Sequence, residues 1–262
     1  MVKNSMKLND DKTEVLIIGK PFVLRRFDLS VSIKFGGDDI EPTPCKGDHW
    51  KSLGVKLDEA LNMERQINWV KQKCSWTMMN IRTIGAYLDQ DVKLMLVKQL
   101  VISKIDYCNA LYMNVTKTRL KKLTSVLNNG IRFIYNIHDR NENLLPYYKK
   151  AHILPIKDRV FFKVCLLCYK IVNNMAPQYL KELITMYIPA DSSRSTRTWP
   201  LEDNLKMVIP KMSKTLAGDR RFTNYAPIAW NSLPLEIRSL NRIDTFKSKL
   251  KNRLYLSMEN PI

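Results

Sequence analysis

The chain has 262 residues, a net charge of +18 and a hydrophobic share of 45%. This composition excludes a disordered chain, and the length allows one or two domains with a real core. Because lysine and arginine outnumber aspartate and glutamate by 43 to 25, a polyanion such as nucleic acid is the partner expected from charge. A basic surface that serves only solubility is the alternative.

The first sixty residues have the periodicity of β-structure. A β-branched run at 14–19 predicts a strand, and the alternation at 29–35 predicts a second one, followed by a turn at Gly36–Asp39 and a short return strand. Residues 50–58 alternate again and predict one further strand, in which Gly54 marks a bulge or a close backbone approach.

Adjacent carboxylates at Asp38 and Asp39 are the one constellation that looks like a polymerase metal site. Two-metal nucleotidyl transfer needs carboxylates from more than one strand, around cations about 3.5–4 Å apart. Among the residues that precede the turn, Asp28 is the one further candidate close to a strand. Glycine and aspartate also tolerate the positive φ angles of a hairpin turn, so the sequence favours an ordinary turn over a catalytic centre.

From residue 62 onward the hydrophobic period is that of helices. The pattern predicts helices at 62–85, from an Asp89 N-cap to Tyr112, from Thr116 to about 135, from Pro155 to 174, and from Pro177 to 184. Residues 189–217 lose the pattern and predict a linker. A helix at 219–226, a turn at Trp230–Pro234 with the indole docked in a core, and an amphipathic helix at 243–256 complete the chain.

Five cysteines in a scattered, odd-numbered set favour a reducing compartment over a disulfide framework. Cys165 and Cys168 form a C-x-x-C pair inside an apolar helix, where buried thiols are expected and a zinc site is not. The most apolar stretch, residues 160–172, is too short to span a bilayer. We therefore expect no cofactor, no small-molecule substrate and no membrane partner.

Several segments, in the same order, resemble the reverse transcriptases of non-long-terminal-repeat retrotransposons (LINE-type, jockey-like). Residues 8–19 look like the strand after the catalytic hairpin of these enzymes, and Trp50–Asp58 is similar to their primer-grip hairpin. Further resemblances are Ser103–Leu111, His152–Arg159, Tyr169–Ile171, Met175–Leu180, Gly218–Phe222, Trp230–Pro234, Ile237–Arg238 and Phe246–Lys251.

The resemblance implies an α+β, predominantly helical fold: a small antiparallel sheet, a thumb-like helical bundle and a helical C-terminal subdomain. Its expected segments are a palm-like β part at 1–60, the thumb-like bundle at 61–136, a helical extension at 137–188, the linker at 189–217 and a basic C-terminal subdomain at 218–262. The fingers and the catalytic aspartates of the family would lie upstream of Leu8. The expectation is therefore a non-catalytic part of an RNA-directed DNA polymerase.

Palm and thumb of such a polymerase hold a template–primer duplex mainly through its phosphates, whatever its sequence. The expected contacts are Lys98, Lys104, Lys117, Arg119, Lys121 and Lys122 in the helices, with Trp50, Lys51 and Gly54 near the primer end. For any single lysine a solvated helix face is the simpler explanation, and only the aggregate charge favours binding. A helical structural or interaction module without a nucleic-acid role is the alternative function.

Overall fold

The computed structural model of the protein describes residues 14–19, 21–24, 26, 33–35, 38–40, 50–187, 205–210 and 221–258. They form the predicted α+β, predominantly helical fold, with two antiparallel sheets of two strands each. The chain divides into two compact units, residues 1–69 and 70–262. The division falls inside one long helix, and not at the expected boundary near residue 60.

The first unit contains a one-turn helix, α1 (Pro21–Leu24), and a hairpin of β1 (Ile33–Phe35) and β2 (Asp38–Ile40). The hairpin is confirmed, but Phe35 pairs with Asp38, so Asp38 and Asp39 belong to the return strand and not to the turn. The strand predicted at 14–19 is wrong, since only Val15 forms a bridge there. A β-branched run becomes a strand only where a neighbour supplies a ladder of hydrogen bonds.

Residues 50–57 form a tight hairpin of β3 (Trp50–Ser52) and β4 (Val55–Leu57), where the periodicity predicted a single strand. Trp50 pairs with Leu57, and the two residues between the strands, Leu53 and Gly54, have φ angles of 45° and 81°. Positive φ at both positions is the mark of a type I′ turn. Apolar and polar residues keep alternating through such a two-residue turn, and this is why the periodicity does not reveal it.

Leucine is a poor residue for the first turn position, because its side chain disfavours the left-handed region by about 1–2 kcal/mol. Leu53 is 89% exposed, so burial contributes little at this position. We expect Leu53→Asn to raise the free energy of unfolding by about 1 kcal/mol, as measured by urea denaturation. Leu53→Ala removes the same apolar surface without favouring the left-handed region, and an equal gain from both variants would contradict this explanation.

The long helix α2 (Glu64–Thr83) confirms the predicted helix at 62–85 and leads into the short 3-10 helix η4 (Gly85–Tyr87). The prediction of one helix from Asp89 to Tyr112 is wrong in its last turns, because the continuous helix ends at Asp106. This stretch consists of α3 (Gln90–Leu96), the π-helical segment η5 (Val97–Ile102), α4 (Ser103–Asp106) and a separate 3-10 turn η6 (Asn109–Tyr112). Cys108 has a φ of 52°, in the left-handed region, and so breaks the helix.

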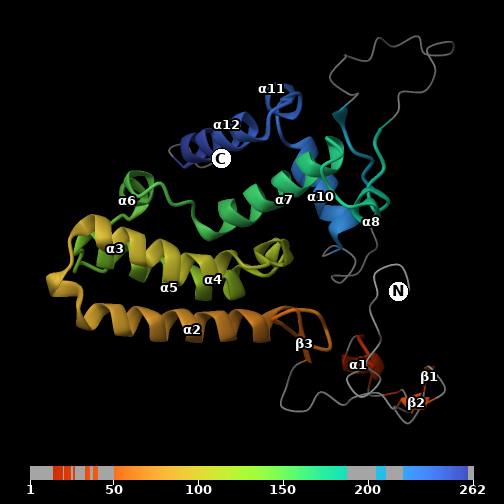
Figure 1. Ribbon diagram of the computed structural model, residues 1–262, viewed down its shortest axis with the longest axis horizontal. Coiled ribbons are helices and arrows are strands. Elements are labelled where there is room, and N and C mark those ends of the chain that lie inside the picture. Colours follow the sequence, from red (N-terminus) through yellow and green to blue (C-terminus); the bar gives the residue numbers. More distant parts are fainter. Residues whose placement is uncertain are drawn as a thin grey trace, which may run out of the picture. The chain divides into compact units, whose positions relative to one another are not determined.

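Helix α5 (Lys117–Tyr135) confirms the predicted helix that begins near Thr116, and it packs along α3 and η5 (Figure 1). Gly130 permits this close packing, because a Cβ atom there would lie 3.0 Å from Cγ1 of Val97. A glycine inside a helix costs about 1 kcal/mol relative to alanine, which the contact with η5 offsets in this position.

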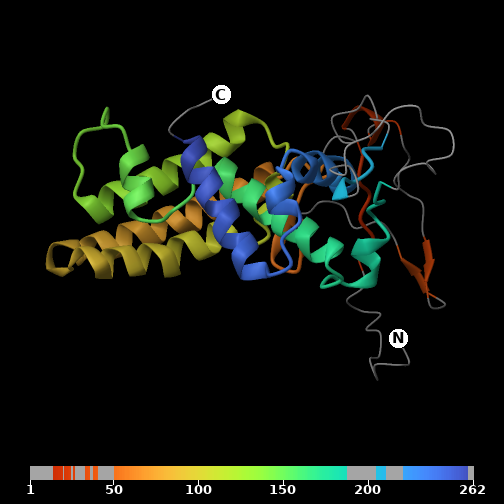
Figure 2. The same ribbon diagram turned by 90° about the horizontal axis from the view of Figure 1, so that it is seen from above.

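Helix α7 (Ile156–Val172) lies between α5 on one side and the pair α10 (Phe222–Asn231) and α12 (Ile243–Ser257) on the other (Figures 1 and 2). Helices α7 and α12 confirm their predictions, and α8 (Gln178–Lys181) is shorter than predicted. Helix α10 continues through Trp230, where a turn was predicted. Three short helices were not predicted: α1, α6 (Leu145–Lys150) and α11 (Leu235–Arg238).

Three stacked aromatic rings form the centre of the core between α7, α10 and α12. The ring of Phe246 lies 4.4 Å from Tyr169 and 6.1 Å from Trp230, measured between centroids. Trp230 Nε1 donates a hydrogen bond of 2.7 Å to the carbonyl of Leu205. The side-chain amide of Asn231 accepts a hydrogen bond from the backbone N–H of Met207 and donates one to the carbonyl of Met207. Residues 205–210, the described part of the expected linker, are therefore tied to α10.

Candidate nucleic-acid interface

The predicted contact residues fall in both units. Trp50 is only 6% exposed, so its ring has little surface to offer to a primer and serves the core instead. Lys51 is exposed and pairs directly across the hairpin with Lys56. Like charges in directly opposite positions destabilise a strand pair, so this hairpin concentrates positive charge at the expense of its own stability.

The first two turns of α5 carry four of the predicted cations, Lys117, Arg119, Lys121 and Lys122. Lys117 and Lys121 are exposed and lie one helical turn apart, so they share a face. The first turn of α5 contains no acidic residue. A helix N-terminus carries about half a positive elementary charge, so cations there are unfavourable for the helix while anions are attracted. The cations in the first turns of α5 therefore lower the stability of the helix and increase the attraction of its N-terminus for an anionic partner.

Lys98 lies in a cluster of cations that was not predicted from the sequence. Its pKa is lowered by burial and by the charges of Lys251 and Arg159. The carboxylate of Asp106 faces Arg159, Lys163 and Lys251, and its pKa is nevertheless raised, because burial outweighs these cations. We name Lys98, Arg159, Lys163 and Lys251 the cationic cluster; they come from η5, α7 and α12.

Asp106 is the carboxylate within the cationic cluster, and its oxygens are already occupied. Oδ2 lies 3.1 Å from Nη1 of Arg159, and Oδ1 accepts a hydrogen bond of 3.1 Å from Asn109. One carboxylate against four cations leaves an excess of positive charge. Burial lowers the pKa of Lys98 most, and the charges of Lys251 and Arg159 lower it further. An excess of cations of this kind attracts anions such as phosphate oxygens.

Lys104 was predicted to accompany Lys98, but the structure gives it a neutral partner. Its Nζ donates a hydrogen bond of 2.6 Å to Oγ1 of Thr77 on α2. This bond joins α4 to α2, so Lys104 has a role in packing.

Sequence reasoning missed three members of the cationic cluster: Arg159, Lys163 and Lys251. Arg159 and Lys163 lie on α7 among its buried apolar residues, and Lys251 is one of several lysines on α12. No local pattern distinguishes Lys251 from Lys249 two residues earlier. Their grouping with Lys98 exists only after α7 and α12 have packed.

The C-x-x-C pair is buried, as predicted. The thiols of Cys165 and Cys168 lie 3.9 and 3.5 Å from the carbonyls of Ala229 and Ala226, and burial raises the pKa of Cys168 to about 12. Within the described residues no three His, Cys, Asp or Glu side chains gather to hold a metal ion, and Asp39 is exposed opposite Lys34. Asp28 lies outside the described residues.

These burial differences predict a sharp difference in thiol reactivity. Cys108 is exposed, whereas Cys74, Cys165 and Cys168 are buried with raised pKa values. Because the thiolate is the nucleophile, we expect iodoacetamide at pH 8 to modify Cys108 about 100-fold faster than these three. Peptide mapping by mass spectrometry measures the rates, and urea-unfolded protein is the control in which they converge. Equal native rates for Cys108 and Cys168 would refute the packing of α7 on α10.

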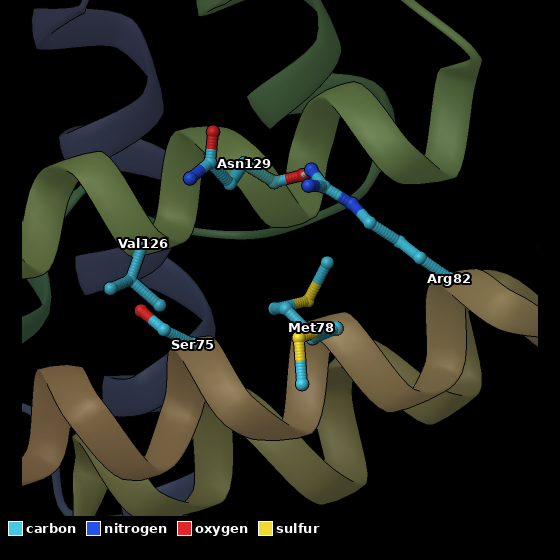
Figure 3. Close-up of a pocket in the computed structure, with 6 residues that line it drawn as sticks. Ser75, Met78, Arg82, Val126 and Asn129 are labelled. Atoms are coloured by element: carbon cyan, nitrogen blue, oxygen red, sulfur yellow. Dashed lines mark hydrogen bonds between the residues drawn. The ribbon is translucent and has the colours of Figure 1, made fainter.

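A second feature of the surface is a small pocket of about 200 Å³ between α2 and α5 (Figure 3). Met78 and Met79 on α2 and Val126 on α5 give it an apolar lining. Arg82 reaches across from α2, and its Nη2 lies 3.4 Å from the carbonyl of Asn129. The pocket is small and has a single charged group, so it does not extend the cationic surfaces.

Comparison with known proteins adds no assignment: no family model, no curated protein and no solved structure matches the chain. Of the helices that the structure describes, none combines the length and apolarity needed to cross a bilayer.

Proposed function

We propose that the chain binds duplex nucleic acid through its phosphates, without sequence preference, and that the cationic cluster is the centre of this surface. The observation that supports it is the gathering of four cations from three helices around one carboxylate, with mutual repulsion between Lys98, Arg159 and Lys251. Burial, and then the charges of Lys251 and Arg159, lower the pKa of Lys98. A phosphate backbone placed over Lys98, Arg159 and Lys251 would reverse that repulsion, and phosphate contacts of this kind dominate non-specific affinity.

The resemblance of the sequence to reverse transcriptases is the second part of the proposal. We propose that the chain corresponds to the end of the palm, the thumb and the C-terminal region of a non-long-terminal-repeat reverse transcriptase. The hairpin of β3 and β4 supports this, because it lies where the resemblance expects the primer-grip hairpin. By itself the chain is proposed to hold template–primer duplex and to incorporate no nucleotides.

Fluorescence anisotropy with two unrelated duplexes of equal length tests the proposal. We expect similar dissociation constants for both, and a steep loss of affinity between 50 and 200 mM salt, about tenfold or more if several phosphates are contacted. Affinity that does not change with salt, or that depends strongly on sequence, would rule out phosphate-based binding. Primer extension with magnesium and deoxynucleotides is expected to give no product.

A structural or interaction module is the second candidate, and one observation favours it. Trp76, Met79 and Tyr87 on α2 and η4 are 62%, 59% and 88% exposed. Trp76 and Met79 are three residues apart on α2 and so share a face, and exposed large apolar side chains that share a face mark a candidate protein contact. Analytical ultracentrifugation separates the candidates, because a stable homo-oligomer without affinity for duplex would favour this one.

A further inference from the structure

A second pocket, of about 490 Å³, lies at the C-terminal end of α5. Three cations from three different helices line it: Arg82 of α2, Lys93 of α3 and Arg132 of α5. His138 also lines it, and no carboxylate is among its lining residues. The volume is within the range of small-ligand sites, and the lining is strongly cationic.

Lys93 is the most buried of these cations, with 6% of its surface exposed. Its ammonium donates a hydrogen bond of 2.8 Å to Oδ1 of Asn136 and lies 5.4 Å from the centroid of the Phe133 ring. Both partners are neutral. A buried charge normally has a charged partner, because neutral groups compensate only part of its lost hydration.

The two guanidinium groups are also incompletely compensated. Nη2 of Arg132 donates a hydrogen bond of 2.9 Å to the carbonyl of Arg140, while its Nε is buried without a hydrogen-bond partner in the described structure. Within the described part of the chain, the hydrogen bond of the Arg82 guanidinium is the long one of 3.4 Å to the carbonyl of Asn129 (Figure 3). Both arginines therefore retain donors that an anion can use.

The helix dipole does not account for this much charge. The C-terminus of α5 carries about half a negative elementary charge, which makes one nearby cation favourable. Arg132 lies in the last turn of α5 and Arg82 in the last turn of α2, so each is near a helix C-terminus. Helix α3 continues into η5, so no helix end compensates the buried charge of Lys93, which is left to an anion or to solvent.

In the wall of the pocket the Phe133 ring packs directly against the backbone of Gly85. A Cβ atom on Gly85 would lie 2.7 Å from Cε2 of Phe133, so only glycine permits the ring to lie where it does. Gly85 and Phe133 both line the pocket, and the ring holds the ammonium of Lys93 against one side of it. The position of the cation thus depends on a specific packing and not on a free surface side chain.

We propose that this pocket binds a phosphate group, presented by a free mononucleotide or by the 5′ end of an oligonucleotide. The planar donors of Arg82 and Arg132 suit phosphate oxygens, and the ammonium of Lys93 supplies the buried charge. The pocket uses none of the residues of the cationic cluster, so the inference does not depend on the proposed duplex binding.

Isothermal titration calorimetry at constant ionic strength tests the pocket with AMP and with adenosine, which differ only in the phosphate. We expect AMP to bind and adenosine not to bind. Arg82→Gln and Arg132→Gln should each weaken AMP binding about tenfold, as expected for the loss of a charge-assisted hydrogen bond. Lys73→Gln, an equal change of charge at an exposed position of α2 outside the pocket, is the matched control and should leave the affinity unchanged.

Oligonucleotides with a 5′-phosphate or a 5′-hydroxyl distinguish the two sources of the phosphate. Tighter binding of the phosphorylated form, lost in Arg82→Gln, assigns the pocket to an oligonucleotide end; equal binding of both forms, with AMP still bound, assigns it to a mononucleotide. Equal binding of AMP and adenosine, or unchanged AMP affinity in both arginine variants, would overturn the inference. Lys98→Met/Lys251→Met should bind AMP normally, so this result stands apart from the duplex measurements.

Discussion

Replacing Lys98 and Lys251 together by methionine is expected to weaken duplex binding roughly 100-fold near 50 mM salt, because each lost phosphate contact removes nearly one released counterion. In a plot of log affinity against log salt concentration, the slope should become less steep by about two, because two phosphate contacts are lost. Methionine keeps the length of the apolar stem, so the change is chiefly one of charge. Fluorescence anisotropy over a salt series measures both effects.

The matched control for this prediction is Lys73→Met with Lys249→Met. Both lysines are exposed on helices, and Lys249 lies on α12 two residues from Lys251. Equal losses of affinity in the two double variants would mean that only net charge matters and that the cationic cluster has no special role.

Trp230→Ala is expected to lower the free energy of unfolding by about 4 kcal/mol, the usual range for emptying a large buried aromatic site. Trp230 is fully buried, stacks on Phe246 and donates its indole hydrogen to Leu205. The variant loses ring packing and leaves a carbonyl unpaired. Chemical denaturation followed by circular dichroism measures the change.

Trp76→Ala is the control for the core prediction, since it removes the same side chain from a site that is 62% exposed. Its effect should stay within about 0.5 kcal/mol, as for most surface substitutions. Trp230→Phe keeps an aromatic ring and should lose less than Trp230→Ala. Similar effects of Trp76→Ala and Trp230→Ala would contradict the placement of Trp230 in the core.

The long helices were predictable from sequence because their apolar faces repeat over many turns. Helices α2, α5, α7 and α12 each have at least fifteen residues over which the period can be read. Helix α6 has six residues, too few for a period, and was missed. The break at Cys108 was missed for another reason: its left-handed backbone follows from packing, since the flanking Asn109 and Tyr112 are 2% and 1% exposed.

The candidate site was predictable only where its residues are neighbours in sequence. The cations at the start of α5 stand within six residues of each other, and their helix is strongly periodic. The partners of Lys98 come from α7 and α12, and nothing in the local sequence of either helix indicates that they approach η5. The burial of Trp50 was likewise invisible, because a single aromatic residue at a strand start fits both a core and a surface.

Lysine footprinting tests the central claim most directly. The protein is acetylated with and without saturating duplex, and mass spectrometry measures the change at each lysine. We predict protection of Lys98, Lys163 and Lys251, and unchanged modification of Lys249 on the same helix as Lys251. Protection spread evenly over all exposed lysines, or absent from Lys98 and Lys251 while duplex is bound, would contradict a duplex surface centred on the cationic cluster.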